Sequence, residues 1–342
     1  MNFSSKLLNW YDVNKRDLPW RNSDNPYVIW IAEVVFQQTR ISQGLPYFNA
    51  FIKKFPDVGA LADANEDEVL KKWQGLGYYS RARNLLFSAK YVMNELGGKM
   101  PASYQEMIKL KGVGPYIAAE VASVCFGEVV AAVDGNVQRV LARYFGVEEA
   151  VNSTKGMKII QGLANEAISQ FRPGDFNQAL MDMGSGVCTP KSPDCLNCIF
   201  VNSCWAKQHD KQGVLPLKEK KVKVRNRYFN YVLKIVNNGV YLRKRPAGDV
   251  WQGLFEPRLI ETIGVRSEIT DLVVDVSYEL YSAKRVLSHQ RLFLRFWVAT
   301  GDTFDYVGND YEWVGVKDLK KFPVTKSIEQ LFLSMEFKSL FK

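Results

Sequence analysis

The chain has 342 residues, and its 45 Lys and Arg residues outnumber its 36 Asp and Glu residues to give a formal net charge of +9. This length exceeds that of one typical domain, so we expect two domains, each with its own core. The N-terminal stretch has no secretory or transit-peptide pattern, and no apolar run is long enough to cross a bilayer. We therefore expect no membrane association, a cytoplasmic location at the nucleoid, and a polyanionic partner.

The first predicted helices contain a buried carboxyl group. Residues 3–14 are predicted to form a short amphipathic helix, and a second helix near residues 27–39 is apolar almost all round. Glu33 lies in the middle of this second helix. Burial should raise its pKa and keep it protonated near neutrality, unless the side chain reaches the surface or pairs with a buried Arg.

A glycine turn follows the next predicted helix, residues 61–74. It places Tyr78 and Tyr79 side by side between Gly77 and a further helix that starts near Ser80. Tyrosines at such positions are usually packing residues. An exposed aromatic ring on a turn can also wedge into a stack of nucleic acid bases.

A tight Gly-Val-Gly turn joins two predicted helices, residues 103–110 and 116–126. Gly112 and Gly114 are expected to adopt positive φ, and Pro115 suits the first helical position. Free amides at such a helix start bind anions, which suits nucleic acid phosphates. Further helices are predicted near residues 136–145, 155–170 and 175–184, so the first part of the chain should be all-α.

Asp134 directly precedes the amphipathic helix that starts near residue 136. The partial positive charge of that helix start would keep its carboxylate ionised, although an ordinary N-cap has the same pattern. Glu33 and Asp134 therefore occupy opposite environments, one desolvated and one at a helix start. Two carboxyl groups set apart in this way can divide acid and anionic roles in catalysis.

Four cysteines follow the last predicted helix of the first part, with the spacing C-x6-C-x2-C-x5-C. Their loop is short and interrupted by prolines, so one tetrahedral metal centre would explain all four thiols. Spacing alone leaves zinc and an iron-sulfur cluster equally possible. The four are Cys188, Cys195, Cys198 and Cys204.

Beyond a Lys-rich, aperiodic linker at residues 209–227, the apolar period changes to two. Two strand-like runs flank Asn237-Asn238-Gly239, a strong β-hairpin signal. Further strands are predicted near residues 252–260, 273–281 and 290–299, and a helix near 326–337. Residues 228–342 should therefore form a mixed α/β domain.

The sequence LKGVGPYIAAEVASV followed by VDGNVQRV resembles the helix-hairpin-helix DNA glycosylase superfamily, whose signature is this hairpin and a catalytic aspartate. Bifunctional members carry a lysine where this chain has Tyr116, and only an amine can form the Schiff base needed for β-elimination. Tyr116, together with Leu18 to Arg21, Ala32 to Val34 and Gln37 to Thr39, is similar to the adenine DNA glycosylases.

The resemblance implies a helical glycosylase domain at residues 1–208 with a [4Fe-4S] loop, and a Nudix-like domain at 228–342. It implies a monomer that binds double-stranded DNA containing adenine opposite 8-oxoguanine or guanine and hydrolyses the adenine glycosidic bond. Glu33 would be the acid and Asp134 the anion, positioned by Tyr116 and Asn136. DNA contacts would come from Trp20, Arg21, Gln38, Tyr78, Gly112, Gly114, Ser288 and His289, and the cluster ligands would be Cys188, Cys195, Cys198 and Cys204.

Three other functions remain as alternatives. An endonuclease III-like bifunctional glycosylase is opposed by Tyr116. A Nudix hydrolase is opposed by the absence of the paired glutamates that hold catalytic magnesium, since Glu256, Glu261 and Glu268 are scattered. A non-catalytic iron-sulfur protein that only binds lesions would keep its function after Glu33→Gln.

Overall fold

A computed structural model describes residues 2–219, 224–264, 276–287, 289–299 and 310–341. The chain forms two compact units, Met1–Asp63 with Phe87–Lys220, and Ala64–Leu86 with Lys221–Lys342. The segment Ala64–Leu86, which lies before the expected domain boundary at residue 208, thus belongs to the second unit. Within the described ranges, no helix is long and apolar enough to cross a membrane.

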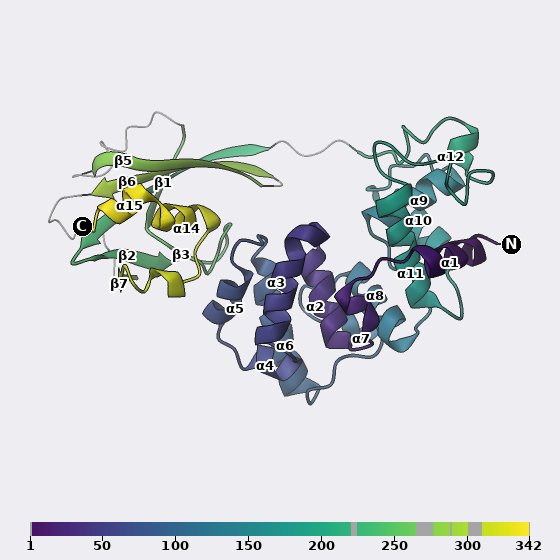
Figure 1. Cartoon of the computed structure of the whole chain (residues 1–342), viewed down its shortest axis with the longest axis horizontal. Helices are drawn as coiled ribbons and strands as arrows, with labels where there is room; N and C mark the ends of the chain where they lie inside the picture. The colour runs from purple at the N-terminus through teal and green to yellow at the C-terminus, as the bar shows by residue number, and fades with distance from the viewer. Residues whose placement is uncertain (1, 220–223, 265–275, 288, 300–309, 342) are drawn as a thin grey trace. The chain divides into compact units, whose positions relative to one another are not determined.

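The first unit is helical, as the sparse strand signals predict (Figure 1). Its core forms between α1, α9, α10 and α11, where Leu7, Val137 and Leu180 are fully buried. Its helical elements are α1 Phe3–Asn14, η1 Pro19–Asn22, α2 Pro26–Phe36, α3 Ile41–Lys54, α4 Val58–Ala62, α7 Tyr104–Met107, α8 Pro115–Phe126, α9 Gly135–Phe145, α10 Thr154–Ala167, α11 Pro173–Asp182, η2 Met183–Val187 and α12 Trp205–Gln208.

Helix α8 lies at the centre of the packing that matters for the site. It packs against both α2 and α11, and α11 in turn packs against α1 and α9. Side chains from α2, α8 and α11 that meet therefore come from distant parts of the sequence: Glu33 and Tyr116 are 83 residues apart, and Tyr116 and Met181 are 65 apart. The start of α9 lies beside this group.

The turn between α7 and α8 only partly follows the prediction. Gly112 has φ +83°, which favours glycine, and Pro115 occupies the first turn of α8 as expected. Gly114 does not have the predicted positive φ. Its φ is −95°, because it is the extended N-cap of α8, where any residue is sterically allowed.

The predicted helix at residues 61–74 is also divided. α4 ends at Ala62, and α5 (Glu66–Trp73) starts after Asn65, which forms a capping box with Glu68. This reciprocal pair satisfies the free amides of a new helix start and so separates the two helices. The following helix, α6 (Ser80–Glu95), begins where predicted.

The described strands of the second unit form one sheet with the order β3-β2-β1-β6-β5, in which β4 pairs with β1 and β7 with β2. α14 and α15 pack on the sheet, and Ile328, Leu331 and Phe337 enter its core (Figure 1). The elements are β1 Arg225–Val236, β2 Gly239–Lys244, β3 Phe255–Glu256, β4 Arg258–Thr262, β5 Val276–Val286, β6 Gln290–Ala299, β7 Tyr311–Gly315, η3 Leu319–Lys321, α14 Lys326–Leu333 and α15 Met335–Ser339.

The predicted hairpin between β1 and β2 is confirmed. Val236 pairs with Gly239, and the two residues between them, Asn237 and Asn238, have φ of 47° and 61°. Two positive φ angles define the turn type that matches strand twist in a two-residue hairpin, and asparagine adopts them at low cost. The α/β nature of this unit therefore follows the prediction.

Candidate active site and cysteine pocket

Glu33 projects from α2 and meets α8 at Tyr116. The Tyr116 hydroxyl donates a hydrogen bond of 2.7 Å to Glu33 Oε2 and also lies 3.0 Å from the Met181 sulfur of α11. The pKa of Glu33 is raised to about 7, chiefly by burial; the Tyr116 hydrogen bond and Arg21 oppose the rise, and the Asp134 charge contributes to it. The protonated form of Glu33 is therefore substantially populated near neutral pH.

Asp134 is the N-cap of α9 and is held by backbone and side-chain donors. Its Oδ1 accepts 2.8 Å hydrogen bonds from the amides of Asn136 and Val137, and its Oδ2 accepts a 2.7 Å bond from Asn136 Nδ2. Three donors at a helix start stabilise a carboxylate in its anionic form. Asp134 therefore lies at the start of α9, where the sequence places it.

Arg139 fixes the orientation of Asn136. Its Nη2 atom donates to Asn136 Oδ1 at 2.9 Å and to the Gly184 carbonyl at 2.6 Å, so the Asn136 oxygen faces Arg139 and the amide nitrogen faces Asp134. Gly184 allows this close packing, since a Cβ there would lie 2.6 Å from Asn136 Cβ. The Arg139 Nε atom also binds the Cys188 carbonyl at 2.7 Å, which ties α9 to the cysteine loop.

Arg21 and Trp20 lie in η1 with different surroundings. Arg21 donates two hydrogen bonds, of 2.6 and 2.9 Å, to Asp182, which also pairs with Arg16. Although burial opposes ionisation, these two guanidinium groups lower the pKa of Asp182. Trp20 is buried, and its ring stacks on the Phe36 ring with the two ring centroids 4.3 Å apart. Trp20 therefore contacts α2 through Phe36, whereas Arg21 is bound to Asp182 at the end of α11.

Two polar residues near Glu33 were not predicted from the sequence. Glu120 of α8 and Gln178 of α11 are both buried. Gln178 Oε1 accepts a 2.8 Å bond from the Tyr11 hydroxyl. A signal for Glu120 was available, since it lies one helical turn after Tyr116 in an apolar helix, as Glu33 does in α2.

Gln38 and Tyr78, the two turn residues that are expected to contact DNA, both have a positive φ angle. Gln38, after the end of α2, has φ +54°, and Tyr78 of the second unit has φ +48° and a 49% exposed side chain. Tyr79 differs from its neighbour, because it is buried and its hydroxyl accepts a hydrogen bond from the Gly75 amide. Only Tyr78 of this pair is presented on the surface of its unit.

The four cysteines of the loop line one pocket next to Arg143. Arg143 Nη1 lies 3.3 Å from Cys188 Sγ and 2.8 Å from the Thr189 carbonyl. Burial raises the pKa values of Cys195, Cys198 and Cys204. Among the described residues, no three or more His, Cys, Asp or Glu side chains are grouped as they would be around a metal ion.

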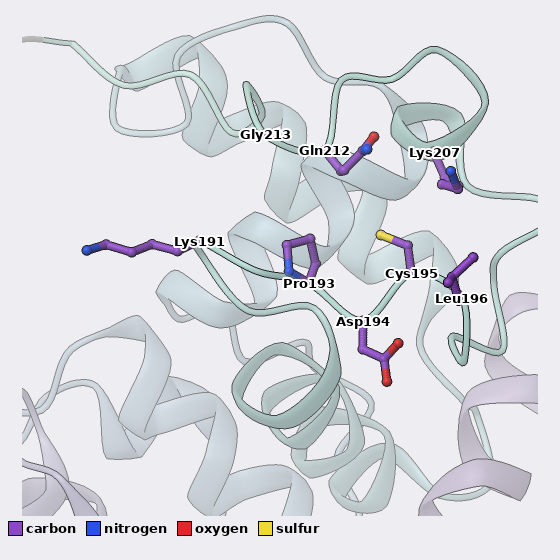
Figure 2. A pocket seen from close by; sticks show the side chains of 8 residues that line it. All are labelled: Lys191, Pro193, Asp194, Cys195, Leu196, Lys207, Gln212 and Gly213. Atoms are coloured by element: carbon purple, nitrogen blue, oxygen red, sulfur yellow. The ribbon is translucent and has the colours of Figure 1, made fainter.

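A second hollow opens beside the cysteine loop (Figure 2). Lys191, Asp194, Cys195 and Lys207 line it, and Figure 2 shows Lys191 extended away from the other side chains. The loop thus presents cationic groups next to the cysteines. Residues 209–219 continue from it and stay attached to the first unit, because Leu215 is buried and its carbonyl accepts a 2.9 Å bond from Arg143.

The residues expected to read 8-oxoguanine are only partly described. Ser288 lies outside the described residues, and the neighbouring His289 is exposed, with its carbonyl accepting a 3.0 Å bond from the Arg225 amide. Two of the scattered glutamates of this unit form ion pairs with arginines. Glu256 binds Arg245 at 2.8 Å and Glu261 binds Arg227 at 2.6 Å. Glu268 also lies outside the described residues.

Residues 31–166 match the HhH-GPD superfamily of base excision DNA repair proteins. This range contains Glu33, Tyr116, Asp134 and Asn136. The match therefore covers these four residues but not Arg21 or Met181.

Curated relatives that are named adenine DNA glycosylase match longer parts of the chain than the superfamily does. A Buchnera aphidicola (subspecies Baizongia pistaciae) relative is 31% identical over 345 residues, 96% of each chain. A mouse relative is 43% identical over 222 residues, 62% of this chain but only 43% of its own length. A solved thermostable thymine-DNA glycosylase is 31% identical, with a TM-score of 0.57 over 60% of this chain and 95% of its own.

Proposed function

Because the chain belongs to the adenine DNA glycosylases, within the HhH-GPD superfamily, we propose that it hydrolyses the N-glycosidic bond of adenine mispaired with 8-oxoguanine or guanine. The product would be an abasic site in double-stranded DNA. The observation that carries this proposal is the combination of Glu33, whose raised pKa keeps a proton available, with Asp134, whose carboxyl group accepts three hydrogen bonds at the start of α9.

The target base must leave the helix before either group can act. Enzymes that work on bases in a duplex extrude the nucleotide into a pocket, at a cost of a few kcal/mol. Gln38 and Tyr78 are proposed to fill or wedge the space around the extruded nucleotide. Gly112 and Gly114, ahead of the free amides of α8, would contact phosphates, and Trp20 and Arg21 would line the adenine pocket.

Glu33 would then protonate the leaving base. Adenine leaves poorly as an anion, and a proton placed on N7 by Glu33 makes it a better leaving group. A positioned general acid contributes about 10² to 10⁴ in rate. The Tyr116 hydroxyl, 2.7 Å from Glu33 Oε2, would stabilise the carboxylate that remains. That carboxylate would activate the attacking water.

Asp134 would stabilise the sugar as the bond breaks. The anomeric carbon becomes cationic, and a fixed anion in a partly buried site interacts with it more strongly than in water. Asn136 and the α9 amides hold the carboxylate in place. Since Arg139 fixes the Asn136 amide, little reorganisation is needed when the positive charge develops.

On our proposal, Tyr116 determines that the strand is not cleaved after the base is removed. A phenol cannot form the Schiff base through which bifunctional glycosylases cleave the strand. The reaction should therefore stop at the abasic site. Both alternatives, a bifunctional endonuclease and a protein that only binds lesions, predict a different product pattern.

We propose that the cysteine pocket holds a [4Fe-4S] cluster. Four thiols line one pocket, and the Arg143 guanidinium 3.3 Å from Cys188 Sγ offsets the negative charge that four thiolates would bring. Cys188, Cys195, Cys198 and Cys204 would hold the cluster. When bound, the cluster would cross-link the loop and so fix Lys191 and Lys207 for phosphate contacts.

The second unit is proposed to recognise 8-oxoguanine as a Nudix-like domain that binds without cleaving. Ser288 would accept a hydrogen bond from N7-H, the group that distinguishes 8-oxoguanine from guanine, and His289 would flank it. Glu256 and Glu261, being paired with arginines, are not available to hold magnesium. We expect the protein to act as a cytoplasmic, nucleoid-associated monomer.

A duplex cleavage assay tests this function. The protein is incubated with labelled duplexes that contain adenine opposite 8-oxoguanine, adenine opposite guanine, or thymine glycol, with and without alkali afterwards. We expect strand breaks only after alkali and only in the two adenine mispairs. Breaks without alkali would support the bifunctional alternative, and breaks at thymine glycol would contradict adenine specificity.

A further inference from the structure

Residues 74–79, here called the Tyr78 turn, are held in shape by neighbouring side chains. The Gly77 carbonyl accepts hydrogen bonds from Trp73 Nε1 at 3.0 Å and from Arg81 Nη2 at 3.2 Å. The Arg81 guanidinium carbon also lies 5.2 Å from the centroid of the Trp73 ring and 5.5 Å from that of the Tyr78 ring. Tyr78 has φ +48°, an angle that is uncommon outside glycine. The exposed Tyr78 ring is therefore presented on a turn with a fixed shape.

Gln74, the first residue of the Tyr78 turn, binds the C-terminal part of the second unit through both ends of its amide. Its Nε2 atom donates a 2.5 Å hydrogen bond to Glu329 Oε1 of α14, and its Oε1 atom accepts a 3.1 Å bond from the Val324 amide. Lys71 Nζ donates to Gln74 Oε1 at 3.1 Å and to the Phe322 carbonyl at 3.0 Å. One side chain at the end of α5 thus joins the Tyr78 turn to α14 and to the segment before it.

The partners of Gln74 permit only one orientation of its amide. The Val324 amide and the Lys71 ammonium group can only donate, so they require the amide oxygen, whereas the Glu329 carboxylate requires the NH₂ group. A hydrogen bond to a carboxylate is stronger than one between neutral groups. Gln74 is therefore a directional link, which a side chain without both a donor and an acceptor cannot replace.

Contacts on both sides of the Tyr78 turn connect it to the same unit. On the α5 side, Leu70 is fully buried, and a Cβ atom at Gly253 would lie 3.3 Å from Leu70 Cδ1, so the glycine allows close packing. On the side of α6, Arg83 Nη1 donates a 2.5 Å bond to the Gln252 carbonyl. The second unit, which also carries His289, therefore holds the Tyr78 turn from both flanking helices.

We propose that Gln74 is a positioning residue, which anchors the Tyr78 turn to α14 so that the unit that recognises the base opposite adenine also places the Tyr78 ring for base extrusion. This inference rests on the proposed glycosylase function. Gln74 touches neither DNA nor a reacting atom on this account. Without the anchor, the Tyr78 ring is still present but moves relative to α14, so extrusion of the adenine slows.

The test exchanges the two side chains that share the 2.5 Å hydrogen bond. Gln74→Glu places a second carboxylate opposite Glu329, where it cannot donate a hydrogen bond and repels the first. The additional change Glu329→Gln supplies a donor from α14 and so rebuilds the bond in the reverse direction. Gln170→Glu, at an exposed position after α10, is the matched control.

Base extrusion and base release are measured separately in the full-length protein. Extrusion is followed by the fluorescence of 2-aminopurine, which replaces adenine opposite 8-oxoguanine and brightens when it leaves the base stack. Release is followed as single-turnover excision of adenine opposite 8-oxoguanine at saturating enzyme. The melting temperature of each variant is recorded alongside.

We expect Gln74→Glu to lower the rates of extrusion and excision about tenfold, the effect of one lost hydrogen bond. The exchange Gln74→Glu/Glu329→Gln should recover both rates to within about threefold of the wild type, and Gln170→Glu should leave them unchanged. In a Tyr78→Ala background, Gln74→Glu should cause no further loss, because the anchor acts through the Tyr78 ring.

Wild-type extrusion by Gln74→Glu would overturn the inference, and so would an exchange that recovers neither rate. A merely structural role predicts a lower melting temperature and an equal proportional loss in the Tyr78→Ala background, and that result would also overturn it. If the wild-type protein itself releases no adenine, the proposed function fails. Excision by the wild type that Gln74→Glu leaves unchanged contradicts only the role of Gln74.

Discussion

Replacing Glu33 by glutamine removes a proton donor while it preserves the shape of the site. Glutamine has nearly the same volume, and its amide oxygen can still accept the Tyr116 hydrogen bond that Glu33 Oε2 accepts at 2.7 Å. The change therefore isolates the general-acid contribution. We expect single-turnover excision to fall by about 10² to 10⁴, while the affinity for mispaired duplex stays within about threefold.

The pH dependence of the excision rate provides a second test of the role of Glu33. Because burial raises the pKa of Glu33 to about 7, the wild-type rate should fall as the pH rises through about 7 and the proton is lost. The alkaline side of the Glu33→Gln profile should lack this titration. Rates are measured from pH 5.5 to 8.5 (about one and a half units on either side of that pKa), with Glu95→Gln, an exposed position on α6, as control.

The stability of the protein should follow the same titration. The folded-state pKa of Glu33 lies above the unfolded value, so the stabilising contribution of its proton is fully present below the unfolded pKa of 4.5 and is lost as the pH rises to about 7. Urea unfolding of Glu33→Gln should lack this part of the pH dependence. Excision by Glu33→Gln within tenfold of wild type, or a wild-type rate that is flat across pH 7, would refute the reasoning.

Three further changes test other parts of the site. Asp134→Asn should lower single-turnover excision by about 10² or more, because a neutral amide cannot stabilise the cationic sugar; duplex binding, measured by anisotropy, should persist. Tyr116→Lys should introduce an amine that borohydride traps on DNA as a covalent complex, and a variant that is never trapped would contradict the reasoning on Tyr116. Arg21→Ala should lower the free energy of unfolding in urea by about 3 kcal/mol, since Asp182 keeps only Arg16 as a partner; an unchanged value would show that Arg16 suffices.

Local chemistry explains which features of the fold were predictable. Asn237, Asn238 and Gly239 specify a two-residue turn by their tolerance of positive φ, and Asp134 caps α9 as residues of its type do. Glu33 in an apolar helix predicted a raised pKa without reference to any distant residue. These features depend on a few neighbouring residues, so a sequence pattern can report them.

Other features depend on residues that meet only after folding or on backbone detail. The positive φ expected at Gly114 was wrong, because glycine permits that angle without requiring it. The bonds from Arg139 to the Gly184 and Cys188 carbonyls join α9 to later segments of the chain, so no short pattern contains them. The break between α4 and α5 depends on Asn65, which forms a capping box with Glu68.

Direct detection of the released base tests the central claim, that Glu33 and Asp134 together hydrolyse the glycosidic bond of adenine. Duplex with adenine opposite 8-oxoguanine is incubated with excess wild-type protein, and free adenine is measured by chromatography together with alkali-labile sites in the same samples. We predict one free adenine for each alkali-labile site, and none from Asp134→Asn on the same timescale. Tight duplex binding without released adenine would contradict the account.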